Sequence, residues 1–274
     1  MQVWVNTGLT DAAEAGLSVF DHGITTGDGV FETIKVEDGS TFALTRHLRR
    51  LARSAKAIGL PEPDFELTRR ACEEVVAANP VSGLGRLRVT FTGGNSPLGS
   101  DRGDEGPSLV VALSEASWPT PTVDVVTVPW PRNERGALAG VKSTSYAENV
   151  LALSYAHDRN GGEAIFGNLA GNLCEGTGSN VFVVVDGTLT TPPLSAGCLA
   201  GVSRALVLEW AGGEERDLPL TALQEAEEAF LVSTTRDVQP IAAVDGRALP
   251  AVPGPVTRKA AETFAARAAE HIDP

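Results

Sequence analysis

The apolar segments of this chain are short and of two kinds, and this pattern constrains its fold more than any other feature. The longest uninterrupted apolar runs, such as 181–185, have the length of a β-strand, whereas a membrane-spanning helix needs about 18 apolar residues. Elsewhere, as in 65–78, apolar residues recur at helical spacing. The mixture predicts an α+β protein in which amphipathic helices cover sheets built from short strands.

Turn residues and apolar periodicity together divide the chain into expected elements. We expect strands at 2–6, 29–36, 41–44, 86–92, 108–114, 122–128, 164–166, 181–185 and 229–233. We expect helices at 45–58 with Thr45 as N-cap, at 65–78, at 145–157, from about 202, from about 221, and at 256–271.

A length of 274 residues suggests one large domain or two modest ones. Trp118, Pro119 and Pro121 mark a candidate linker, since Pro-rich stretches interrupt regular structure. We therefore expect a small N-terminal domain at 1–116, a linker at 117–121 and a larger domain at 122–274.

Charge and composition exclude several classes of function. With 35 acidic and 22 basic residues the net charge is −13, so we expect neither nucleic acid nor an anionic membrane as a partner. The three cysteines Cys72, Cys174 and Cys198 show no CxxC spacing, and the four histidines are scattered, so we expect no disulfide framework and no metal site. No export signal is visible at the N-terminus, which favours a cytoplasmic protein.

Lysine is scarce in this chain. Only four of the 22 basic residues are lysines: Lys35, Lys56, Lys142 and Lys259. Where a positive charge alone is needed, the chain uses arginine. A lysine that follows small residues, as Lys142 follows Ala139 and Gly140, is therefore a candidate for amine chemistry, because only lysine forms an imine. The competing interpretation is an ordinary surface lysine.

Five blocks of sequence, in order along the chain, resemble one family. They are Asp21-His22-Gly23 with Gly27-Asp28-Gly29-Val30-Phe31-Glu32, then His47-Leu48-Arg49-Arg50-Leu51, then Lys142-Ser143-Thr144-Ser145-Tyr146, then Glu175 to Arg204, and then Ser233-Thr234-Thr235 with Pro240. Together they resemble the fold-type IV pyridoxal phosphate enzymes, and above all the D-amino-acid aminotransferases and aminodeoxychorismate lyases. The resemblance covers nearly the whole chain. It implies a small α/β domain, a larger domain with a curved, barrel-like mixed sheet, pyridoxal 5'-phosphate as cofactor, and a homodimer.

The resemblance also implies roles for individual residues. Lys142 matches the lysine that holds the cofactor as a Schiff base, and Glu175 matches the acid that keeps the cofactor's ring nitrogen protonated. The cofactor phosphate is expected to bind residues from three segments: Arg50, then Gly201, Val202 and Ser203, then Thr234 and Thr235. Phe31 and Thr33 are expected to floor the substrate pocket.

Several of these residues have a plainer interpretation from local sequence. Arg50 would share a solvated helix face with Arg46, Arg49 and Arg53. Glu175 could be a surface carboxylate in a loop, and the segment 27–29 could be no more than a hairpin turn. Tyr146, one helical turn from Lys142 if that segment is helical, either contacts the cofactor or belongs to the core.

The substrate is less constrained than the cofactor. D-amino-acid aminotransferases commonly bind the substrate carboxylate with an Arg-x-His pair shortly after a Ser-Pro, and here Ser96-Pro97 is followed by Leu98-Gly99-Ser100. Arg102 and Arg236 are candidates to replace that pair, and each has an alternative as a surface arginine.

Four functions remain open. The first is a ping-pong transaminase that moves an amino group from D-amino acids, and from (R)-amines as a further donor class, to a 2-oxo acid such as 2-oxoglutarate or pyruvate. The second is an aminodeoxychorismate lyase that yields 4-aminobenzoate and pyruvate. The third is a homologue that binds the cofactor without catalysis, and the fourth is a branched-chain enzyme selective for L-amino acids.

Overall fold

A computed structural model describes residues 1–274, and the chain divides into two compact units. The first unit contains 1–117, 141–146 and 272–274, and the second contains 118–140 and 147–271. Residues 141–146 and 272–274 fall within the range expected for the larger domain from sequence. Both segments belong to the first unit because the backbone of Lys142 and Thr144 bonds residues 29–31, and because Ile272 O and the Asp273 carboxylate accept hydrogen bonds at the start of the first long helix.

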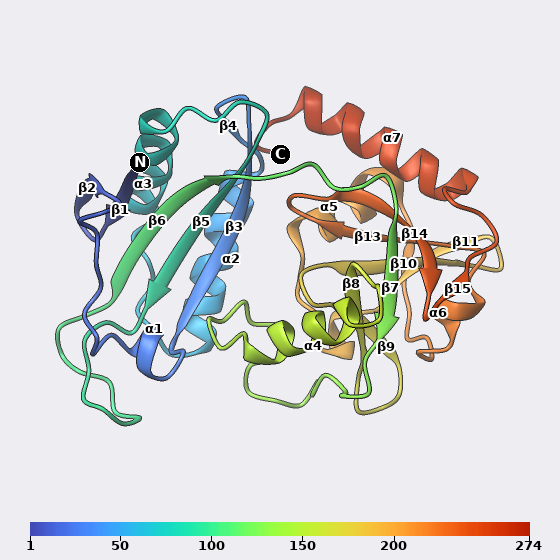
Figure 1. Ribbon diagram of the computed structural model, residues 1–274, viewed down its shortest axis with the longest axis horizontal. Coiled ribbons are helices and arrows are strands. Elements are labelled where there is room, and N and C mark those ends of the chain that lie inside the picture. The colour runs from blue at the N-terminus through green and yellow to red at the C-terminus, as the bar shows by residue number, and fades with distance from the viewer. The chain divides into compact units, whose positions relative to one another are not determined.

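The first unit is built on a six-stranded antiparallel sheet with the order β2-β1-β6-β5-β3-β4, drawn in blue and blue-green in Figure 1. Its strands are β1 (Gln2–Val5), β2 (Gly8–Asp11), β3 (Gly29–Glu37), β4 (Ser40–Thr41), β5 (Leu84–Thr92) and β6 (Ser108–Glu115). Its helices are α1 (His22–Thr25), α2 (Leu44–Ala57) and α3 (Phe65–Ala78).

One face of this sheet carries the core of the first unit. Along β3, Val30, Ile34 and Val36 are buried with apolar side chains of α2 and α3, among them Leu51 and Val75. Because successive strand residues point to opposite faces, Phe31 and Thr33 belong to the other face. The alternation in sequence therefore decides which β3 side chains are available for a site.

Helix α2 begins differently from the prediction. Thr45 is not its N-cap: the capping position is Ala43, which has φ 55° and makes no side-chain capping bond. The cap comes instead from Asp273, whose carboxylate accepts hydrogen bonds from Thr45 N at 2.8 Å and Thr45 Oγ1 at 2.5 Å. The expected strand at 41–44 is likewise shorter, because β4 ends at Thr41.

The second unit is built on a nine-stranded mixed sheet with the order β12-β11-β10-β13-β14-β7-β8-β9, and β15 pairs with β14. Its strands are β7 (Val123–Thr127), β8 (Glu163–Gly167), β9 (Leu173–Gly176), β10 (Asn180–Val185), β11 (Thr188–Thr191), β12 (Glu214–Glu215), β13 (Glu228–Ser233), β14 (Asp237–Val244) and β15 (Arg247–Ala248). Strand β9, at one end of this order, also contacts β10, so the sheet curves into a half-barrel.

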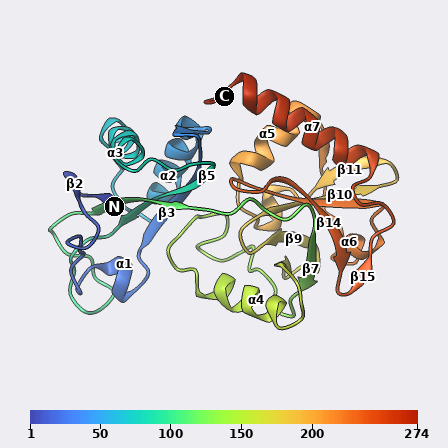
Figure 2. The same cartoon turned by 45° about the horizontal axis from the view of Figure 1, so that its top comes forward.

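Helices pack on the curved sheet of the second unit. They are α4 (Ala147–His157), α5 (Val202–Ala211), α6 (Ala222–Glu225) and α7 (Pro255–Glu270), with a short 3-10 turn η1 (Leu194–Ala196). Helices α5 and α7 contact each other and β13, and both views of the molecule show α7 lying across this part of the unit (Figures 1 and 2). No helix is both long enough and apolar enough to cross a membrane.

Candidate active site

Lys142 lies on a short segment that pairs with the start of β3. Phe31 N donates to Lys142 O at 3.0 Å, and Thr144 N donates to Gly29 O at 2.8 Å. The Thr144 hydroxyl adds a bond to Gly27 O at 2.7 Å. This strand-like pairing delays helix α4 until Ala147, so the expected helical spacing from Lys142 to Tyr146 is wrong.

The amine of Lys142 faces aromatic rings. Its Nζ lies 4.3 Å from the ring centroid of Phe31 and 6.0 Å from that of Tyr146. The two rings pack edge to face with centroids 5.3 Å apart, and Phe31 is buried. Tyr146 therefore contributes to the surroundings of the amine from outside the helix in which the sequence placed it. Thr33, two residues beyond Phe31 on the same strand face, is half-buried.

The turn before β3 needs glycine for a local reason. Gly27 has φ +70°, and a Cβ there would lie 2.8 Å from Ser145 Oγ, on the segment that carries Lys142. This close approach of residue 27 to Ser145 explains the glycine in Gly27-Asp28-Gly29 better than a hairpin turn alone does. The backbone around Gly27 and Gly29 holds residues 142–145 in place.

Arg102 is committed to structural contacts. Its Nε and Nη2 each donate to the Asp28 carboxylate at 2.7 Å, and its remaining bonds go to the carbonyls of Ile58 and Gly59 at the end of α2. The bond from Arg102 holds the pKa of Asp28 below its ordinary value. A guanidinium with four such bonds has few donors left for a substrate carboxylate.

Arg50 is buried, which rules out the solvated helix face for this arginine. Its Nε and Nη2 each donate to Glu32 at 2.7 Å, and His47 Nδ1 lies 2.7 Å from the same carboxylate. Burial alone would raise the pKa of Glu32, but the charge and hydrogen bonds of Arg50 outweigh it and hold that pKa well below its usual range. Burial lowers the pKa of His47, so the pair Glu32–Arg50 carries the charges.

In the second unit, Glu175 lies on β9 and is held at both oxygens. Oε2 accepts a hydrogen bond from Leu199 N at 2.8 Å, and Oε1 lies 3.4 Å from Nε of Arg132. Its side chain is 13% exposed. That burial and pairing differ from the solvated loop carboxylate that local sequence left open.

Gly201, Val202 and Ser203 form the N-terminus of α5. Gly201 is the capping residue and makes no side-chain cap, and Val202 and Ser203 are buried. A Cβ at Gly201 would lie 2.0 Å from Asn180 Oδ1, and the amide of Asn180 in turn bonds Leu199 O at 2.9 Å. The backbone N–H groups that open a helix suit an anion such as a phosphate.

Thr234, Thr235 and Arg236 lie in the tight turn between β13 and β14, where Ser233 pairs with Asp237. Both threonines are half-buried. Arg236 donates from Nη2 to the buried Glu163 at 2.9 Å and from Nη1 to Gln239 at 2.5 Å. Like Arg102, it is held by protein groups rather than directed at an outside carboxylate.

Arg88 was not among the site residues expected from sequence. This residue of β5 lies directly opposite Thr33, so it shares the strand face of Phe31 and Thr33. Its guanidinium lies 3.9 Å from the Phe31 ring centroid, its Nε donates to Thr90 Oγ1 at 3.1 Å, and no carboxylate pairs with it. Only the strand register shows that Arg88 and Lys142 contact the same ring, so local sequence could not have found it.

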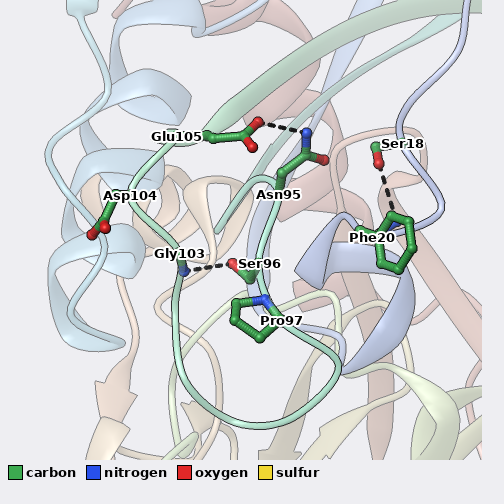
Figure 3. A pocket seen from close by; sticks show the side chains of 8 residues that line it. All are labelled: Ser18, Phe20, Asn95, Ser96, Pro97, Gly103, Asp104 and Glu105. Carbon is green, nitrogen blue, oxygen red and sulfur yellow. Dashed lines mark hydrogen bonds between the residues drawn. The ribbon is translucent and has the colours of Figure 1, made fainter.

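A cavity of about 270 Å³ lies in the first unit beside the loop after β5. Figure 3 shows its lining, in which Asn95 bonds Glu105 and Gly103 N bonds Ser96 Oγ. Asp104 and Glu105 give it a negative wall, which disfavours a substrate carboxylate. Leu98, on the same loop, is 73% exposed.

Each unit, taken by itself, carries groups whose chemistry suits a part of pyridoxal phosphate. The first offers a lysine amine over an aromatic floor, and the second offers a clamped carboxylate, a helix N-terminus and two threonine hydroxyls. These groups match the aldehyde, ring nitrogen and phosphate of pyridoxal phosphate. The structure contains no cluster of three or more His, Cys, Asp or Glu residues that could hold a metal ion.

Comparison with known proteins agrees with this chemistry. Residues 29–244 match the family model described as amino-transferase class IV. A provisionally named branched-chain-amino-acid aminotransferase of Methanocaldococcus jannaschii is 34% identical, covering 96% of this chain and 95% of the relative. The D-alanine aminotransferase of Staphylococcus haemolyticus is 30% identical, covering 96% of each. The branched-chain aminotransferase structure from Thermoproteus uzoniensis has a TM-score of 0.89 and 32% identity, covering 97% of this chain and 93% of that one.

Proposed function

The chain belongs to the class IV aminotransferases, which use pyridoxal phosphate, and on this basis we propose that it moves an amino group from D-amino acids to a 2-oxo acid such as 2-oxoglutarate or pyruvate. The observation that carries the proposal is the Lys142 amine, which lies over Phe31 on a segment fixed to β3. (R)-amines are proposed as a further class of donor.

Each residue has a definite task in this proposal. When bound, pyridoxal phosphate supplies an aldehyde for amines and a ring that withdraws electrons from the substrate carbon. Lys142 Nζ holds the cofactor and then moves the proton at the substrate carbon. Glu175 accepts a hydrogen bond from the ring nitrogen, and the start of α5 with Thr234 and Thr235 binds the phosphate.

Arg50 is proposed to bind the cofactor phosphate as well. Its Nε and Nη2 each donate to the Glu32 carboxylate, and its guanidinium supplies the positive charge for the phosphate. The Glu32 carboxylate fixes the plane of the guanidinium. In this arrangement Glu32 positions Arg50, and Arg50 contacts the anion.

Arg88 is the best-supported residue for the substrate carboxylate. Arg102 and Arg236 are bonded to Asp28 and Glu163, whereas Arg88 has no carboxylate partner and shares the Phe31 ring with Lys142. In an amino acid the carboxyl carbon is only two bonds from the amine nitrogen, so a substrate whose amine lies near Lys142 has its carboxylate near as well. A guanidinium on the same ring can therefore meet that carboxylate in a charge-assisted pair.

A branched-chain L-amino-acid aminotransferase is a second candidate function. It is favoured by the 34% identical relative and by the TM-score of 0.89 to the Thermoproteus uzoniensis enzyme. Holoenzyme mixed separately with D-alanine, L-leucine and (R)-1-phenylethylamine, without an acceptor, separates the candidates, because a true donor converts the absorbance of the bound cofactor. Reaction with L-leucine alone would replace the proposal. If no donor reacts but aminodeoxychorismate yields 4-aminobenzoate and pyruvate, the activity is that of a lyase.

The assignment of Lys142 has a direct test. Borohydride reduction of the holoenzyme followed by peptide mapping should find the cofactor on Lys142. The Lys142→Ala variant should lose covalent attachment while keeping its circular dichroism. Label on Lys35, Lys56 or Lys259 instead would contradict the assignment.

The role of Arg88 predicts a selective change in substrate binding. Arg88→Gln should raise the apparent dissociation constant for an amino-acid donor about 10- to 100-fold, since a charge-assisted pair contributes about 1.5–3 kcal/mol. The value for (R)-1-phenylethylamine, which has no carboxylate, should stay within about twofold. Arg86→Gln, two residues along the same strand face, is the matched control. Equal losses for both donors would argue against a carboxylate contact.

A further inference from the structure

Arg132 lies next to Glu175 in the second unit. Its backbone N donates to Gly167 O at 2.7 Å, next to the end of β8. Its guanidinium stacks 4.0 Å from the ring centroid of Phe166, and Phe166 is the residue directly opposite Glu175 in the β8–β9 pair. The sheet register therefore brings the arginine alongside the carboxylate.

The contacts of Arg132 divide between two ends of its guanidinium. Nη1 is bonded to the side chains of Glu148 and Asn149 on α4. Nε lies 3.4 Å from Glu175 Oε1, and it is buried without a hydrogen-bond partner. Buried arginine donors are normally satisfied. The Nε of Arg132 has Oε1 of Glu175 as its ion-pair partner, and Leu199 N donates a hydrogen bond to Oε2 of the same carboxylate.

The surroundings of Glu175 are otherwise unfavourable to a negative charge. Cys174 and Cys198 are buried near it, and burial, followed by the charge of Glu175, raises the pKa of the Cys198 thiol to about 12. The other acid whose charge reaches Cys174 is Glu134, and Arg132 is the cation that opposes both. In such a place a carboxylate without a cation tends to take up a proton.

We propose that Arg132 is a positioning residue for Glu175, which it holds as an anion directed at the cofactor's ring nitrogen. The inference rests on the proposed role of Glu175. A single proton is shared between the ring nitrogen and the carboxylate, and a cation beside Oε1 favours the arrangement in which the nitrogen carries that proton. Without Arg132 the proton moves to Glu175, and the ring withdraws electrons less strongly.

The proton can be observed without measuring turnover. Holoenzyme carrying ¹⁵N at the cofactor's ring nitrogen should show the chemical shift of a protonated nitrogen. Arg132→Gln should move that signal toward the unprotonated value, and Arg132→Lys, which keeps the charge, should restore it. Glu148→Gln removes the other acidic partner of Arg132, on α4, and should leave the signal in place.

Kinetics gives a second readout. Arg132→Gln should slow the donor half-reaction about tenfold or more, which corresponds to a change of about one unit in the pKa of Glu175. The dissociation constant of the donor should stay unchanged. In a Glu175→Gln background the same substitution should have no further effect, because Arg132 acts only through that carboxylate.

The two proposals fail in different ways. If Glu175→Gln leaves the ¹⁵N signal unchanged, the role proposed for Glu175 is wrong and that of Arg132 falls with it. If Glu175→Gln shifts the signal but Arg132→Gln does not, the role of Arg132 alone is overturned. Should Arg132→Gln not fold, Arg132→Lys decides, since a fully shifted signal with the charge retained contradicts the proposal.

Discussion

At the scale of single residues, the buried charges of the first unit have partners far away in the sequence. Arg50 on α2 donates two hydrogen bonds to Glu32, 18 positions away on β3. Both side chains are buried, so this pair depends on packing between a helix and a strand, which local sequence does not contain. The scarcity of lysine in the sequence, by contrast, singles out Lys142, whose amine lies against Phe31.

The buried Glu32–Arg50 pair predicts a large loss of stability on breaking it. Glu32→Gln leaves the Arg50 charge buried without its carboxylate, which typically costs about 3–5 kcal/mol. Urea unfolding at pH 7 measures the loss in the free energy of unfolding. The slope of that free energy against urea concentration should be the same in both proteins. Glu37→Gln is the control on the same strand, because Glu37 is 48% exposed and its ion pair with Lys35 spans 3.7 Å. Its cost should be below about 1 kcal/mol. Equal costs for the two variants would contradict a strong buried pair.

The same carboxylate predicts a direction for the pH dependence of stability. The pKa of Glu32 in the folded protein lies well below its ordinary value, mainly because Arg50 outweighs the effect of burial. Its contribution is therefore complete above about pH 4.3, where the unfolded side chain is also ionised, and declines as the pH falls further. The Glu32→Gln variant should lack this part of the acid dependence. Parallel curves for the two proteins between pH 5 and 3 would argue against it.

At the scale of elements, locally determined structure was predicted well. Helix α3 has the expected bounds, and β3, β5 and β6 differ from expectation by at most two residues at either end. Elements fixed by distant residues were missed or misplaced. The predicted helix from 221 has only four residues in α6, and β9, β11 and β14 were not identified. Residues 143–146 form no helix because they pair with the turn at 27–29.

The start of α2 shows how a distant residue sets a boundary, and it predicts a stability effect. Asp273, 228 positions from Thr45, supplies the capping acceptor. Asp273→Ala should lower the free energy of unfolding by about 0.5–2 kcal/mol, the usual cost of losing an N-cap. Asp273→Asn retains an acceptor oxygen and should cost less. Glu270→Ala, an exposed control near the same end of the chain, should be close to neutral. An unchanged free energy of unfolding for Asp273→Ala would contradict the stabilising role of this cap.

At the scale of the whole molecule, the motifs predicted the family and its cofactor, because residues that bind the aldehyde, ring nitrogen and phosphate are restricted in type. The substrate was less predictable. Its carboxylate could be bound by an arginine from any part of the fold, and the sequence does not show that Arg102 and Arg236 pair with Asp28 and Glu163, whereas Arg88 stacks on Phe31 without a carboxylate partner. The division into units was also partly hidden, since 141–146 and 272–274 belong to the first unit although the residues next to them in the sequence belong to the second.

The resemblance to fold-type IV enzymes predicts a two-fold homodimer with an isologous interface. Helix α4 offers apolar side chains for such contacts, because Val150 and Leu151 are 65% and 55% exposed. Exposed apolar residues grouped on one helix often mark an interface. Sedimentation should give twice the chain mass of 28.6 kDa, and Leu151→Glu should shift the species toward monomer. Val252→Glu, at another exposed apolar position, should leave the mass unchanged. An active monomer of the wild-type chain would contradict the dimer, and a dimer that tolerates Leu151→Glu would place its interface away from α4.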